Sequence, residues 1–155
     1  MSTLKVLGFI SIVGAVLSAL GCYLPWAQST PMQHAFFYPG GLIYGMTLTV
    51  GIFAVLGCLV AFFSHVFFIA KGKNYAVLVA FVGGLVAYSC SSAWILEPGV
   101  FESGVSLLYG AHVTLVGAII ILIATTLLLV KLSEKTVKQN SEFASQNPTA
   151  AENPS

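Results

Sequence analysis

The side chains best able to do chemistry in this sequence gather around one side of its apolar stretches. His112 lies just inside an apolar stretch, while His34, Glu97 and Glu102 lie in polar segments that should reach the same side. Imidazole and carboxylate groups that converge bind metals or relay protons. Their spacing matches no metal-binding motif, and a membrane-embedded histidine more often pairs with a backbone carbonyl. We therefore predict a candidate outer-face site, with a structural histidine as the favoured interpretation and with no metal and no cofactor.

Aromatic residues mark the same side of the apolar stretches. Tyr44 and Tyr109 join the candidate site, and Trp26 and Trp94 lie at a similar depth. Such side chains either form the aromatic belt of a membrane interface or line a pocket for a lipid or quinone. The belt is the favoured interpretation, because Trp and Tyr are enriched at this depth in membrane proteins generally.

The cysteines and the remaining histidine suggest no further chemistry. Cys22, Cys58 and Cys90 form no Cys-x-x-Cys pair, so small buried hydrophobic residues are a better description than a redox couple. Cys22 and Cys90 share a depth, which leaves a disulfide between them open. His65 belongs to the opposite end from His112, so the two imidazoles are badly placed to ligate one haem.

The elements that position these residues must lie in lipid. Of the 155 residues, 57% are hydrophobic and 7% are charged, against roughly 25% charged residues in soluble domains. So little charge excludes a soluble enzyme, a nucleic-acid binder with a basic patch and a disordered chain. Because a bilayer core needs roughly 20 apolar residues with internally bonded backbone, the sequence predicts an all-α integral membrane protein, a four-transmembrane-helix bundle. The predicted spans are residues 4–24, 41–63, 75–96 and 105–130.

The lysines predict how the bundle is oriented. Lys5 precedes the first span, Lys71 and Lys73 separate the second from the third, and Lys131 follows the fourth. The other two connections contain no Lys or Arg. By the positive-inside rule the N- and C-termini are cytoplasmic, in a multi-pass protein of the cell membrane. No Lys, Asp or Glu lies in the middle of a span, which disfavours a buried carboxylate pathway for ions or protons.

The two ends of the chain need separate interpretations. Residues 1–131 form the predicted four-span membrane domain, and residues 132–155, rich in polar residues and Pro, form a predicted disordered cytoplasmic tail. Alternatively, the start of the tail extends the fourth helix and rests on anionic lipid headgroups. The N-terminal apolar run resembles a signal peptide, and Ala19–Cys22 resembles a lipobox, but the length of the run favours a retained first span.

Self-similarity suggests a duplicated helical hairpin, which would be a parallel repeat. The segment Leu42–Gly45 (LIYG) matches Leu107–Gly110 (LLYG), and a threonine follows each final glycine by four residues, at Thr49 and Thr114. The alternative is coincidence, because membrane helices draw on few residue types.

Small residues at helical spacing predict where the helices pack. In lipid, helices associate through close backbone approach and interhelical hydrogen bonds. The residues that we expect at helix contacts are Gly14, Ser18, Gly41, Gly45, Gly83, Gly84, Gly110 and Gly117. Several spans carry two small faces, which predicts a spare face for a homo-oligomer or a membrane-protein partner.

The ending of the first span, Leu24-Pro25-Trp26, precedes a polar loop and a glycine-led second span. This pattern resembles a loose group of small four-span prokaryotic membrane proteins of unassigned activity. The resemblance covers about the first half of the chain and implies a topology and no chemistry. The chain lacks the Trp and paired-Cys signature of claudin-like outer loops and the first-span Glu of small proton-coupled multidrug transporters.

These features favour a non-catalytic multi-pass membrane protein that serves as an accessory or assembly subunit of a membrane complex. The first alternative is a small oligomeric transporter or channel, motivated by the repeat and by the polar positions Thr47, Thr49 and Thr114. The second is a membrane enzyme that uses His112, or a lipid- or quinone-binding protein with an outer-face site. The expected surroundings are the lipid bilayer, and nucleic acid is not an expected partner.

Overall fold

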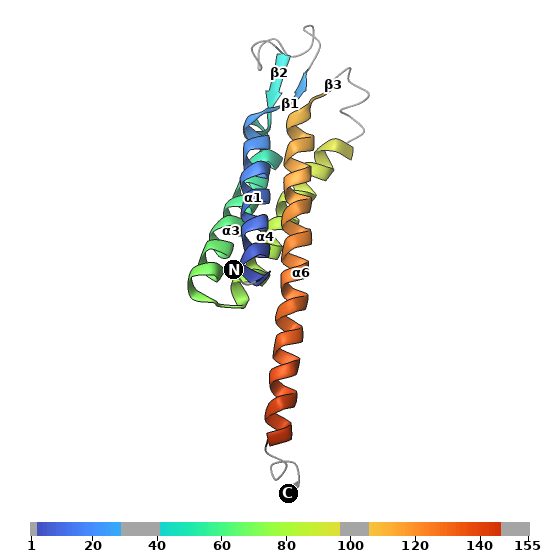
Figure 1. Cartoon of the computed structure of the whole chain (residues 1–155). Coiled ribbons are helices and arrows are strands. Elements are labelled where there is room, and N and C mark those ends of the chain that lie inside the picture. The colour runs from blue at the N-terminus through green and yellow to red at the C-terminus, as the bar shows by residue number, and fades with distance from the viewer. Residues whose placement is uncertain (1–2, 29–40, 97–105, 147–155) are drawn as a thin grey trace, which may run out of the picture.

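Apolar runs that must satisfy their own backbone in lipid fold as helices. The computed structural model describes residues 3–28, 41–96 and 106–146 (Figure 1). The long helices are α1 (Thr3–Tyr23), α3 (Thr49–Lys71), α4 (Tyr75–Leu96) and α6 (Tyr109–Gln146). Each is long and apolar enough to cross a membrane, and the four pack as a bundle. The predicted multi-pass helical architecture is therefore confirmed.

The four helices close into a ring in which each helix packs on two others. α1 lies against α3 and α6, and α4 lies against the same two helices. The most extensive contact joins α1 to α6, so the first and last helices of the chain are neighbours. The turn between α3 and α4 is short, and Gly72 ends α3 in the left-handed conformation with φ 66°.

A small antiparallel sheet lies at one end of the bundle and was not predicted. Its strands are β1 (Pro25–Gln28), β2 (Leu42–Tyr44) and β3 (Ser106–Leu107), in the order β2-β1-β3. Ala27 of β1 pairs with Ile43 on one side and with Leu107 on the other. The sheet therefore ties together the ends of α1, α3 and α6 (Figure 1).

This sheet explains why some helices begin later than the sequence suggested. The third predicted span matches α4, and the first lies within a residue of α1. The second was predicted from residue 41 to 63, whereas α3 runs from Thr49 to Lys71, because Leu42–Tyr44 is a strand and a 3-10 turn, η2 (Gly45–Thr47), follows it. The fourth begins at Tyr109 and not at 105, because β3 precedes it.

α6 continues far beyond the predicted fourth span. The sequence suggested disorder from residue 132, but the helix extends to Gln146 and runs past the turn between α3 and α4 (Figure 1). Elongating an existing helix needs no new nucleus, and Glu134 precedes Lys138 at the favourable spacing of four. The Thr136 hydroxyl also donates to the Leu132 carbonyl oxygen at 3.0 Å. Residues 147–155 lie outside the described residues.

Small side chains, some of them polar, dominate the interior of the bundle, while large apolar side chains cover its surface. The buried side chains of α1 are Gly8, Ser11, Gly14, Ala15, Ser18, Gly21 and Cys22. Exposed positions on the same helix include Phe9, Val13 and Leu20. This distribution is expected where lipid covers the outside and close backbone packing holds the inside together.

Candidate functional site

The structure places three residues of the predicted outer-face site at the sheet end of the bundle. His112 is exposed near the start of α6, and its Nδ1 lies 3.2 Å from the Leu108 carbonyl oxygen. Tyr109 is also exposed, and it shares one side of the helix with His112 because the two positions are three residues apart. Tyr44 is exposed at the end of β2, which lies across β1 from β3. The sheet end thus presents exposed amphipathic side chains on both sides of the small sheet.

The remaining members of that predicted site, His34, Glu97 and Glu102, lie outside the described residues. Among the residues described, no three His, Cys, Asp or Glu side chains are placed to hold a metal ion together. His112 makes the backbone hydrogen bond that the structural interpretation expects.

Trp26 is the central residue of the sheet end. The sequence favoured an aromatic belt at the membrane interface for this residue and did not indicate that it is buried. Its side chain is completely buried, and Nε1 donates a hydrogen bond to the Gly21 carbonyl oxygen at 3.0 Å. A Cβ at Gly45 would lie 2.5 Å from Nε1, and a Cβ at Gly110 would lie 2.8 Å from Cδ1. The final glycines of the two matching LIYG and LLYG segments therefore both contact one indole ring. The Trp94 ring lies 6.3 Å from it between centroids, at 49°.

The contact between α1 and α6 combines backbone packing with polar side chains. A Cβ at Gly14 would lie 2.9 Å from the Gly117 carbonyl oxygen. The Ser18 hydroxyl donates to the Thr114 carbonyl oxygen at 2.8 Å, and Cys22 Sγ lies 3.6 Å from the Thr114 hydroxyl. The polar groups at this depth therefore bond between helices.

The other predicted packing residues are distributed over the remaining contacts. Gly83 of α4 faces Gly57 of α3, where a Cβ at either position would lie within 2.6 Å of the partner's carbonyl oxygen. Gly84 faces Ile121 of α6. Gly41 precedes β2 with φ 70°, so it belongs to the turn into the sheet and lies before the start of α3.

The end of the bundle opposite the sheet is flanked by Lys5, Lys71, Lys73 and Lys131, and we call it the lysine end. His65 is buried at this end. Its side chain has no exposed area, and Nδ1 lies 3.0 Å from the Ala61 carbonyl oxygen and 3.3 Å from Ser11 Oγ. Nε2 has no hydrogen-bond partner among the residues that the structure describes. The imidazole thus links α3 to α1 within the interior.

The cysteine thiols are free in the structure. Cys22 and Cys58 are buried, and Cys90 is partly buried. The disulfide that the sequence left open between Cys22 and Cys90 does not form.

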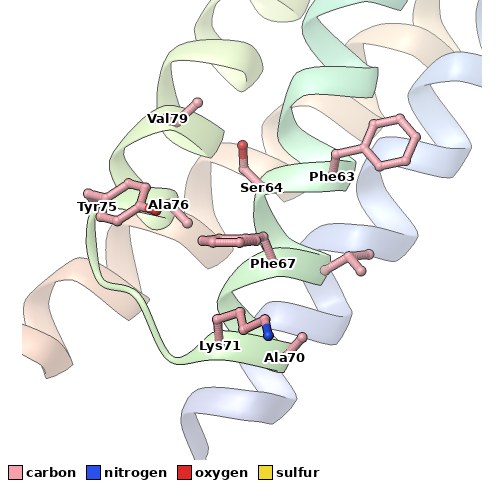
Figure 2. A pocket seen from close by; sticks show the side chains of 9 residues that line it. Phe63, Ser64, Phe67, Ala70, Lys71, Tyr75, Ala76 and Val79 are labelled. Carbon is pink, nitrogen blue, oxygen red and sulfur yellow. The ribbon is translucent and has the colours of Figure 1, made fainter.

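A groove lies between α3 and α4 at the lysine end of the bundle. It has a volume of about 520 Å³ and opens to the side of the bundle. Figure 2 shows Phe67 of α3 and Tyr75 of α4 directed toward one another. Phe63 and Lys71 of α3 and Val79 of α4 also line the groove. The groove is almost entirely apolar except for the Lys71 ammonium near its end.

Sequence reasoning overlooked this groove because its residues are ordinary lipid-facing types. A signal was nevertheless present, since Phe63, Phe67 and Lys71 recur every four residues and so share one side of a helix. The position of Tyr75 four residues beyond Lys71, after a Gly-containing turn, predicts that α4 returns beside them.

No protein-family model, no curated protein and no solved structure matches this chain.

Proposed function

We propose that this multi-pass membrane protein is non-catalytic and acts as an accessory or assembly subunit of a membrane complex. The observation that carries the proposal is the outer end, where a sheet fixed by a buried tryptophan holds Tyr44, Tyr109 and His112 exposed. Tyrosine is enriched at protein interfaces, because it offers a large contact area and a hydroxyl with little loss of side-chain freedom.

The interior supports the same proposal. Ser11, Ser18, Cys22 and His65 all make contacts that join helices, so these reactive side chains have structural partners. The backbones of α1 and α6 meet at Gly14 and Gly117 without room for a methyl group. A path for solute along that contact would require the two helices to separate.

Two further features belong to this proposal. We infer that the lysine end, with both termini, faces the cytoplasm, which follows from the positive-inside rule. We also infer a duplicated helical hairpin, α1–α3 and α4–α6. Its support is that the segments LIYG and LLYG flank β1 on opposite sides and that Gly45 and Gly110 contact the same ring.

Site-specific photo-crosslinking tests the accessory role. A photoreactive amino acid at Tyr109 should give one discrete heavier adduct in the native membrane, and the partner should co-purify in equal amounts in mild detergent. The matched control is the same amino acid at Val13, which is 63% exposed but lies mid-span in α1. No adduct at Tyr109, together with a monodisperse monomer in detergent, would count against the proposal.

Reconstitution separates the alternatives. Liposomes that contain the purified protein should show no flux of ions or solutes above that of empty liposomes. A flux that scales with the square of protein density would favour the oligomeric transporter or channel instead. An unchanged cellular phenotype on His112→Ala would remove the main support for an outer-face enzyme.

A further inference from the structure

The groove between α3 and α4 has the form of a site for a single lipid chain. Its walls are Phe63 and Phe67 from α3 and Val79 from α4, and Ala76 supplies a buried floor. The Phe67 and Tyr75 rings lie 6.1 Å apart between centroids. Small residues lie at the floor, and the groove is open to the side of the bundle.

One end of this groove is polar and positively charged. Lys71 occupies the last turn of α3 and lines the groove, and Lys73 follows in the exposed turn. No Asp or Glu occurs anywhere between residues 49 and 96, so neither helix supplies an opposing carboxylate. The tyrosine ring of Tyr75, at the same end, is exposed as expected for an interfacial residue.

The length of the groove matches one leaflet of a bilayer. Phe63 and Lys71 are eight residues apart, which corresponds to a rise of about 12 Å at about 1.5 Å per residue. Half of a hydrocarbon core of about 30 Å is about 15 Å. Lys71 then lies at headgroup depth while Phe63 lies near the bilayer centre.

From this arrangement we propose that the groove binds an anionic glycerophospholipid, with an acyl chain between α3 and α4 and its phosphate at Lys71. A second copy of the chain fits less well, because an apolar helix laid along the groove would meet the ammonium group at its end. The leaflet at the lysine end is the cytoplasmic one by the proposed orientation, and that leaflet is rich in anionic lipids.

Native mass spectrometry of the full chain in detergent tests the charged end. Palmitoyl-oleoyl phosphatidylglycerol should bind more tightly than palmitoyl-oleoyl phosphatidylcholine. Lys71→Gln should lower this preference by about fivefold, which is the effect expected for one lysine at a membrane surface. The matched control is Lys138→Gln, an exposed lysine on α6 away from the groove, which should keep the preference.

A second pair of variants tests the apolar part. Val79→Trp, in the groove, should weaken both lipids by about tenfold, since the indole takes the space of the acyl chain. Val82→Trp, at an equally exposed position of α4 that does not line the groove, should leave both affinities unchanged. Thermal melting of each variant establishes that it is folded.

Four results would overturn the proposal. Equal losses in the two lysine variants would mean that surface charge alone attracts the lipid. Equal effects of the two tryptophan variants would place the acyl chain elsewhere. Displacement of the lipid by inorganic phosphate alone, or a homodimer broken by Val79→Trp, would assign the groove to a free anion or to a second copy.

Discussion

At the closest points between helices, a single hydrogen atom decides how near the backbones come. Gly117 illustrates this best, because a Cβ there would lie 2.7 Å from the Gly14 carbonyl oxygen, which is backbone and cannot move aside. Gly8 differs, since its nearest neighbour is Ile69 Cδ1 at 3.2 Å, the end of a flexible side chain. The two glycines therefore have different tolerances for the same substitution.

Gly117→Ala should lower the free energy of unfolding by about 1–3 kcal/mol, because α1 and α6 must separate to admit the methyl group. Gly8→Ala, at the contact of α1 with α3 near the lysine end, is the control and should be neutral, since Ile69 can adopt another rotamer. Thermal unfolding of both proteins in detergent measures the difference. Equal melting temperatures would show that this contact does not limit stability.

Polar residues of the interior could be predicted by type but not by partner. Ser18 was expected at a helix contact, and the structure places it on the Thr114 carbonyl oxygen. His65 was expected only near the lysine end, and its link to Ser11 depends on how α1 and α3 are rotated about their axes. Every helix of this chain carries small and apolar residues on all its sides. The sequence therefore determines only weakly how each helix is rotated about its axis.

At the scale of elements, the sheet is the feature that hydropathy could not reveal. The apolar character from residue 41 to 70 exceeds what a bilayer requires, so composition alone does not say which part is membrane helix. Pairing with β1 makes Leu42–Tyr44 a strand, so the membrane helix α3 begins only after it. α4 was predicted accurately because Lys73 and Glu97 bound its apolar run on both sides.

Trp26→Ala should reduce the free energy of unfolding by about 3–5 kcal/mol, the usual effect of removing a large buried aromatic ring. The indole fills the space between Gly45 and Gly110, so its removal leaves a cavity there. Tyr23→Ala, a nearby aromatic residue that is 61% exposed, is the control and should change stability by less than about 0.5 kcal/mol.

Equilibrium unfolding in detergent, followed by circular dichroism, distinguishes these outcomes. A Trp26→Ala protein as stable as the Tyr23→Ala protein would show that the sheet end contributes little to the fold.

At the scale of the whole molecule, the lysines gather at one end of the bundle. Lys5, Lys71, Lys73 and Lys131 all flank the end of the bundle opposite the sheet. Four membrane helices were predictable from this chain because lipid admits few alternatives for a backbone without water. The function could not be predicted from the sequence, because a surface that contacts only lipid and a surface that contacts a protein partner have similar residue types.

Cysteine labelling tests the orientation directly. Ser106→Cys, exposed at the sheet end, should react with a membrane-impermeant maleimide in intact cells. Lys135→Cys, exposed at the other end, should react only after permeabilisation. The unsubstituted chain controls for its own thiols, of which Cys22 and Cys58 are buried. The reverse pattern would place the lysine end outside.

The position of Trp26 also determines when the packing around its ring can form during synthesis of the chain. The indole emerges from the ribosome with the first helix, and Gly45 follows soon after, but Gly110 arrives only with the last helix. Until then one side of the ring has nothing to pack against, and the most extensive helix contact, α1 with α6, is also missing. The first three helices are therefore inserted before the packing around this ring is complete, and a product truncated before α6 should be less stable than the full chain.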